Sequence, residues 1–152
     1  MGTLRLLLVF IGLSLCQWLG AQDVSYDSTL AKQLQADDYG MRKYTFVLLK
    51  TGPNTTANKA FIDSCFAGHM QNIERLAAEG KLVVAGPYSK NEDQWRGLFI
   101  FASDSFEQVE QWLAMDPAIK NQLLTPSLFS WYGSAALPTY LPNHDKVTKK
   151  KF

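Results

Sequence analysis

Two helix-like stretches of this sequence each lie between strand-like stretches, and this order limits the folds open to the chain. Apolar runs typical of strands occupy residues 43–50, 82–87, 96–103 and 127–133. With a helix after the first and third runs, the order β-α-β-β-α-β predicts an α+β fold. Two helices then cover one face of a four-stranded antiparallel sheet, and the other face stays open. An open apolar face usually signals association, so we expect a homodimer built from two facing sheets.

Both predicted helices have recognisable ends. The first starts near Thr56 or Asn58 and runs to about Glu79, where a glycine follows as an expected C-terminal cap. The second begins after Ser103 or Asp104, either of which can cap it. It ends at the Asp-Pro pair of residues 116–117, because a residue before proline avoids the helical region.

The first residues have the parts of a secretory signal. Arg5 lies in a short n-region, the apolar core LLLVFIGLSL follows, and small residues precede Gln22. The apolar core is too short for a comfortable membrane span. We therefore expect residues 1–21 to be a signal peptide, with export to a bacterial periplasm or the medium and no stable membrane insertion after cleavage. A lipoprotein modified at Cys16 and an uncleaved anchor are the less favoured alternatives.

The remaining chain divides into three parts. Residues 22–42 are polar and predict a flexible leader, with one helical turn near Leu30. Residues 43–136 form the expected α+β domain, and 137–152 form a C-terminal extension with the basic tail KVTKKKF. We interpret the tail as a solvated end rather than a polyanion contact. A formal net charge of +1 also gives no reason to expect nucleic-acid binding.

The residue inventory excludes several kinds of catalytic site. Removal of the signal leaves one cysteine, Cys65, so no intramolecular disulfide can form and the core must provide the stability. Its apolar neighbours favour a buried structural cysteine over a reactive thiol. The chain has no P-loop, G-x-S-x-G or HExxH motif, and two isolated histidines with one cysteine do not make a standard zinc site. We expect neither a metal nor an organic cofactor.

One titratable side chain lies on the apolar face of the first predicted helix. His69 is four residues after Cys65 and four before Ile73, so all three share a face. From the residues alone, the favoured interpretation is a core histidine whose ring nitrogens find partners. The alternative is an acid or base in a pocket between helix and sheet, tuned by a carboxylate. The other histidine, His144, is expected to be solvated in the C-terminal extension.

Asp116 is the carboxylate most suited to partner His69. It ends the second predicted helix beside Pro117, in an otherwise apolar neighbourhood. Two roles remain open: it can hold backbone amides at a turn, or it can orient His69. Spacing along the chain does not decide between them, because only the fold can bring the two residues together.

The sequence around these two residues resembles the YCII-related, or YciI-like, family over about residues 43–133. The matching positions are His69, Leu76, 79–82 (EGKL), 85–87 (AGP), Gly97, Phe106, Trp112 and 116–117 (DP). The resemblance implies a ferredoxin-like fold and a dimeric α+β barrel. It also implies that His69 and Asp116 occupy the places of the family's active-site pair. The chemistry that it implies is dehydrochlorinase-like, on a ring substrate. The signal peptide and the leader depart from the family pattern.

These observations lead to one main functional hypothesis and two alternatives. The main hypothesis is an exported enzyme of lyase or hydrolase type that uses the His-Asp pair for acid-base chemistry on a small molecule. Gly86 and Pro87 would shape the pocket wall, and Tyr88 and Trp131 would supply aromatic contacts. One alternative is a non-catalytic dimeric module that binds a small molecule or an envelope protein. The other is a purely structural histidine.

Overall fold

A computed structural model describes residues 25–150, and the expected signal peptide lies outside this range. The sheet contains β1 (Met41–Thr51), β2 (Leu82–Pro87), β3 (Trp95–Phe101) and β4 (Leu124–Ser134). The main helices are α3 (Lys59–Ala78) and α4 (Phe106–Leu113), with the single turn α5 (Pro117–Lys120) after them. The shorter helices at the ends are α2 (Ser28–Gln33), η2 (Leu137–Tyr140) and α6 (Leu141–Val147).

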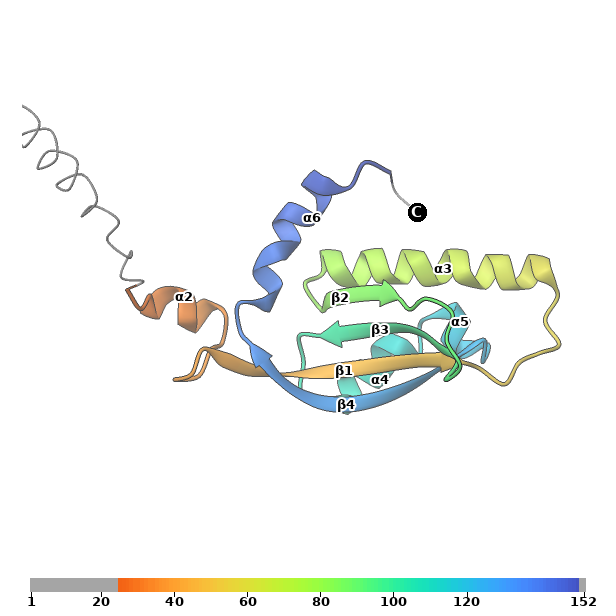
Figure 1. The fold of residues 1–152 in the computed structure, drawn as a ribbon, viewed down its shortest axis with the longest axis horizontal. Helices are drawn as coiled ribbons and strands as arrows, with labels where there is room; N and C mark the ends of the chain where they lie inside the picture. The colour runs from red at the N-terminus through yellow and green to blue at the C-terminus, as the bar shows by residue number, and fades with distance from the viewer. Residues whose placement is uncertain (1–24, 151–152) are drawn as a thin grey trace, which may run out of the picture.

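The strand order confirms the predicted fold class. The four strands form one sheet in the order β2-β3-β1-β4, and every neighbouring pair is antiparallel. Helices α3 and α4 connect β1 to β2 and β3 to β4, which is the βαββαβ order of a ferredoxin-like fold. In Figure 1, α4 lies behind the strands, so the view is onto the opposite face of the sheet.

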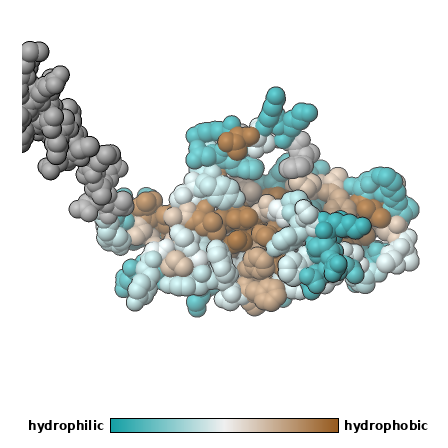
Figure 2. All heavy atoms as spheres, in the orientation of Figure 1, coloured by the Kyte–Doolittle hydropathy of each residue, from teal (hydrophilic) through white to brown (hydrophobic). Residues whose placement is uncertain are grey.

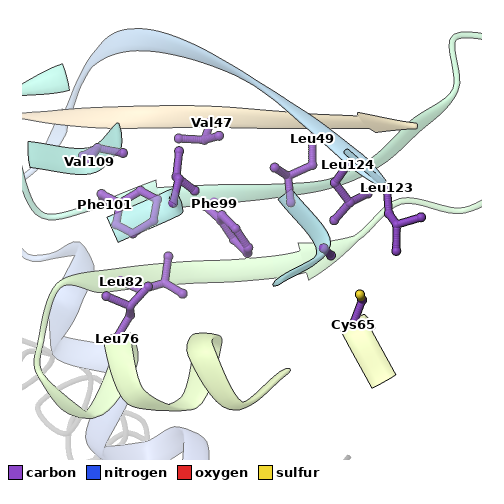
Figure 3. Close-up of a cluster of buried hydrophobic side chains, with 12 residues drawn as sticks. Val47, Leu49, Cys65, Leu76, Leu82, Phe99, Phe101, Val109, Leu123 and Leu124 are labelled. Atoms are coloured by element: carbon purple, nitrogen blue, oxygen red, sulfur yellow. The ribbon is translucent and has the colours of Figure 1, made fainter. Parts of the chain in front are cut away.

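The hydrophobic core lies between the sheet and its helices. Alternate residues of the central strands point into it, among them Val47 and Leu49 from β1 and Phe99 and Phe101 from β3. Leu76 is one of the residues that α3 contributes. Figure 3 shows these side chains gathered between the strands and the helix, with Cys65 at one edge of the cluster. Cys65 is buried and free, as its apolar neighbours predicted.

The helix starts follow side-chain capping. The Asn58 side chain accepts a hydrogen bond of 2.9 Å from the Phe61 amide and caps α3. At α4 the cap is Ser105, not the predicted Ser103 or Asp104. The Ser105 hydroxyl accepts a hydrogen bond of 3.3 Å from the Gln108 amide, whereas the Ser103 hydroxyl accepts one of 3.2 Å from the Ser105 amide, ahead of the helix. The true start of α4 is therefore later than the sequence indicated.

The segment before the sheet is more structured than the predicted leader. It contains α2, capped by Asp27, and β1 begins at Met41, two residues earlier than expected. The Asp37 carboxylate accepts hydrogen bonds from the Met41 amide, at 3.0 Å, and from the Tyr132 hydroxyl of β4. The expected helical turn near Leu30 is present as α2. These contacts join the leader to the edge of the sheet.

The C-terminal extension is helical in its described part. Strand β4 leads into η2 and α6, which rise from the end of the sheet in Figure 1. The Tyr140 hydroxyl donates a hydrogen bond to the backbone carbonyl of Val83 in β2. Burial of that phenol raises the pKa of Tyr140. Between residues 25 and 150, no helix has the length and apolar character needed to cross a membrane.

Candidate active site

The site begins with the innermost stripe of α3. Its four buried residues are Cys65, His69, Asn72 and Leu76, which recur at helical spacing and face the sheet. The two in the middle are polar. His69 is 8% exposed, and its ring lies near the rings of Phe66 and Phe99, with centroid separations of 5.9 and 5.8 Å. The imidazole is therefore framed by aromatic side chains from α3 and β3.

Asp116 reaches this imidazole from the turn between α4 and α5. Its side chain is fully buried, at 0% exposure, and its Oδ2 lies 2.6 Å from His69 Nδ1. Its Oδ1 accepts from the backbone amides of Ala118, at 2.9 Å, and Ile119, at 3.4 Å. Asp116 thus caps α5 with one oxygen and contacts the histidine with the other. The two roles left open by the sequence are both present in the geometry.

A glycine allows the two elements to approach this closely. Gly68 precedes His69 on α3, and a Cβ placed there would lie 2.7 Å from Cγ of Pro117. Carbon atoms pack at about 3.5–4.0 Å, so any larger residue would push α5 away from α3. Pro117 is the first residue of α5 and follows Asp116 directly. The spacing between His69 and Asp116 therefore depends on the missing side chain at position 68.

The second ring nitrogen of His69 has a different environment. No group among residues 25–150 makes a hydrogen bond to Nε2. In that same range, every buried polar side-chain atom has a hydrogen-bond partner. Nε2 must therefore reach the molecular surface, where water or a ligand can contact it. The imidazole has one nitrogen fixed by a carboxylate and one nitrogen open to a small molecule.

The other predicted site residues lie on different faces of the sheet or beyond the end of β2. Gly86 and Pro87 belong to β2, and Pro87 pairs with Gly97, on the sheet face that Phe99 shares. Gly86 pairs with Leu98, at a register position that belongs to the opposite face. Tyr88 follows the end of β2, and its ring packs at a tilt of 56° against Trp95 of β3, with centroids 5.6 Å apart. Pro87 therefore lies on the sheet face that packs against α3 and His69, and Gly86 lies on the other face.

The structure does not bring Trp131 to the pair. It pairs with Tyr44 across β1 and β4, and their ring centroids are 5.6 Å apart. Tyr44 and Val47 are three residues apart on one strand, so their side chains point to opposite faces. Val47 lies in the core with Phe99, the neighbour of His69. Trp131 is therefore on the open sheet face, opposite the face that packs against α3.

Two site residues were missed by the sequence reasoning. Phe99 stacks near His69 from β3, and no short-range pattern links the two positions. Asn72 contacts Asp116, with 3.5 Å between its Nδ2 and Oδ2 of the carboxylate. The signal for Asn72 was available, because residues three apart share a helix face and Asn72 follows His69 by three.

A separate surface depression lies at the start of β1. It has a volume of about 500 Å³ and is open to solvent. Residues from the leader, the start of β1, the segment just after β3 and Tyr132 of β4 line it, and neither His69 nor Asp116 is among them. Within the described chain, no three His, Cys, Asp or Glu side chains gather closely enough to hold a metal ion. The histidine–aspartate contact, and not the depression, is therefore the candidate active site.

Comparisons with known proteins identify the family of the chain and two solved structures similar to it. A family model described as the YCII-related domain matches residues 44–126. No curated protein matches the sequence. One solved structure with a similar fold is 5-chloro-2-hydroxyhydroquinone dehydrochlorinase from Burkholderia phenoliruptrix, in complex with 2,5-dihydroxybenzoquinone. It is 22% identical, with a TM-score of 0.42, and the match covers 58% of this chain and 90% of that one.

A second similar structure is a dimeric protein of unknown function with a ferredoxin-like fold, from Bacteroides fragilis. It is 14% identical, with a TM-score of 0.42. The match covers 60% of this chain and 95% of that chain.

Proposed function

The chain belongs to the YCII-related domain family, and from that membership and the site geometry we propose that it is an acid-base enzyme of lyase or hydrolase type. His69 is its proton-transferring residue and Asp116 is the partner that orients the ring. The observation that carries this proposal is the asymmetry of the imidazole. Nδ1 lies 2.6 Å from a fully buried carboxylate, while Nε2 has no hydrogen-bond partner in the described chain.

The asymmetry supports catalysis over a purely structural role. A histidine that only completes the core usually has both ring nitrogens paired, and here only Nδ1 has a hydrogen-bond partner within the described chain. Here the carboxylate accepts the Nδ1–H hydrogen bond, so the neutral ring keeps a lone pair on Nε2. When Nε2 takes a proton, the ring becomes positively charged and the adjacent carboxylate stabilises it. This arrangement suits a general base that returns its proton as a general acid.

The proposed reaction is proton transfer to or from a small organic molecule bound at Nε2. In an elimination, Nε2 removes a proton from the substrate. The two electrons of the bond that held this proton form a double bond, and the leaving group departs with the electron pair of its own bond. In a hydrolysis, Nε2 removes a proton from the attacking water instead. The aromatic frame of Phe66 and Phe99 favours a flat, largely apolar substrate, in line with the ring substrate that the sequence resemblance implies.

Turnover of a substrate panel tests the proposal. Small cyclic phenols, halogenated hydroquinones and lactones are incubated with the protein, and their ultraviolet spectra are followed. His69→Gln should lower any turnover by at least about a hundredfold, the lower end of general-base contributions. His144→Gln is the matched control, because it removes the other, exposed imidazole and should leave turnover unchanged.

The variants also separate catalysis from binding. Near-ultraviolet circular dichroism tests whether His69→Gln keeps the native fold. Turnover that survives His69→Gln in a folded protein contradicts the proposed role. If a panel compound binds wild type and His69→Gln equally and is not converted, the non-catalytic binding module replaces the enzyme.

We also propose that the protein works as a homodimer through its open sheet face. Phe129 is 51% exposed and Trp131 is 39% exposed, and both lie on this face, opposite the helices. Figure 2 shows further apolar side chains gathered over the strands on the side turned to the viewer. A second copy is the occupant that we favour, because two such sheets can pack face to face as a barrel and bury both patches.

Export is the third part of the proposal. It rests on the pattern of residues 1–21: a charged start, a short apolar core and a small-residue cleavage site before Gln22. Sequencing the N-terminus of the protein recovered from the cell envelope or medium tests it. A mature chain that starts at Gln22 supports export, and an intact N-terminus in the cytoplasm contradicts it.

A further inference from the structure

Asn72 is the second polar residue in the buried stripe of α3, one turn after His69. It is 7% exposed and lies between His69 and Leu76 on the face that packs against the sheet. A buried amide is costly unless its donors and acceptor find partners. The partners of Asn72 therefore indicate what this residue contributes to the site.

Both ends of the Asn72 amide are engaged, and the two contacts differ in kind. Its Oδ1 accepts a hydrogen bond of 2.8 Å from Nη2 of Arg75. Its Nδ2 faces Oδ2 of Asp116 at 3.5 Å, the same oxygen that contacts His69. A guanidinium only donates, so Arg75 fixes which end of the amide carries the oxygen. The NH₂ end must then face the carboxylate.

Arg75 is itself held at the end of the helix. Its Nη1 donates to Oε1 of Glu79 at 2.9 Å, and Lys81 contacts Oε2 of the same carboxylate at 2.5 Å. The Lys81 ammonium and, after it, the Arg75 guanidinium hold the pKa of Glu79 below its usual range. A series of polar contacts therefore connects the end of the helix, through Arg75 and Asn72, to Asp116.

We propose that Asn72, fixed by Arg75, is a positioning residue that keeps Oδ2 of Asp116 directed at Nδ1 of His69. The proposal rests on the proposed function, since the orientation matters for catalysis only if His69 transfers a proton. Ala118 and Ile119 hold the other carboxylate oxygen, Oδ1. Asn72 is the one additional side chain of residues 25–150 that contacts Oδ2. Without it, the carboxylate keeps its anchor but loses a restraint on its rotation.

The test measures the His69 ring directly and needs no substrate. Proton–nitrogen NMR in mildly alkaline buffer gives the tautomer of the ring and the exchange rate of the Nδ1 proton with solvent. Asn72→Leu replaces the amide with an apolar side chain of similar size. We expect Nδ1–H exchange to become roughly threefold to tenfold faster, the effect of losing one hydrogen bond of ordinary net strength.

A second variant keeps the proposal testable if Asn72→Leu does not fold. Arg75→Met retains an unbranched apolar stem at a position 38% exposed, so folding should tolerate it. It frees the Asn72 amide to turn and should accelerate exchange in the same direction. Thr45→Val is the control: it removes a different buried hydrogen bond, 2.8 Å long to the Ser103 carbonyl, and should leave the His69 spectrum unchanged.

The outcomes distinguish this inference from the proposed function. If the folded Asn72→Leu and Arg75→Met variants have the wild-type tautomer and exchange rate, Asn72 is only a structural residue and the inference is wrong. In that case, loss of turnover in His69→Gln would still support the enzyme. If exchange accelerates but turnover is unaffected by His69→Gln, the positioning contact exists and the catalytic role fails.

Discussion

Replacing Gly68 by alanine should disturb the site without touching either proposed catalytic side chain. The new methyl carbon would lie 2.7 Å from Cγ, 3.4 Å from Cδ and 3.5 Å from Cβ of Pro117. The closest of these contacts is about 1 Å short of normal carbon packing. The proline ring is rigid, so α5 must move away from α3 by several tenths of an ångström or more. Asp116 precedes that proline and must move with it.

Two opposing effects set the magnitude. Adding a methylene to a packed interface costs about 1–3 kcal/mol. Alanine is favoured over glycine inside a helix by about 0.5–1 kcal/mol, which offsets part of that cost. We expect a net loss of about 0.5–2 kcal/mol in the free energy of unfolding. The His69–Asp116 hydrogen bond should also weaken, because a shift of Asp116 lengthens the 2.6 Å separation between Nδ1 and Oδ2.

Urea unfolding and the ring NMR spectrum of His69 measure the two effects separately. Ala67→Gly, at the exposed neighbouring position, calibrates the helix term and should destabilise by about 0.5–1 kcal/mol. Gly68→Ala should lower the urea midpoint and accelerate exchange of the His69 Nδ1 proton. If Gly68→Ala instead raises the free energy of unfolding by as much as Ala67→Gly lowers it, and the His69 spectrum is unchanged, then Gly68 is not needed for the close approach of α3 and α5.

Two further predictions concern other parts of the chain. The Tyr132 hydroxyl and then the Met41 amide lower the pKa of Asp37, so its stabilising contribution is complete above about pH 3.8 and is lost as pH falls through the lower folded-state value. The gap in urea midpoint between wild type and Asp37→Asn should therefore shrink from pH 6 to pH 3, and a constant gap would contradict the contact. Light scattering should give a dimer for wild type and a monomer for Phe129→Asp, because the charge would lie in the apolar interface. A monomeric wild-type protein at micromolar concentration, or a dimeric variant, would contradict the proposed interface.

Much of the fold followed from local patterns. The run from Leu82 to Pro87 has the predicted bounds, and α3 ends one residue before the position expected from its glycine stop. The helical series around His69 also placed it correctly on the inner face of α3. These features depend on spacing within one element, which a single sequence displays directly.

The remaining features depend on contacts between distant segments. The turn α5 follows Asp116 because that side chain caps it, and the short motif had indicated only the end of the preceding helix. A glycine inside a helical pattern, such as Gly68, indicates close packing. The sequence does not show that the segment packed against it is Pro117. The polar leader predicts a flexible segment, because its anchors, Tyr132 and the start of β1, lie elsewhere in the chain. Trp131 was assigned by residue type alone, although alternation along β4 directs it to the open face.

The most direct test of the central claim is the tautomer of His69 in the wild-type protein, measured by two-bond proton–nitrogen NMR in mildly alkaline buffer. The Asp116 carboxylate at 2.6 Å predicts a proton on Nδ1 and a lone pair on Nε2, the nitrogen open to substrate. Asp116→Asn should abolish that strong preference. A ring that carries its proton on Nε2 in the wild-type protein would contradict the account, because the nitrogen meant to accept a proton would already hold one.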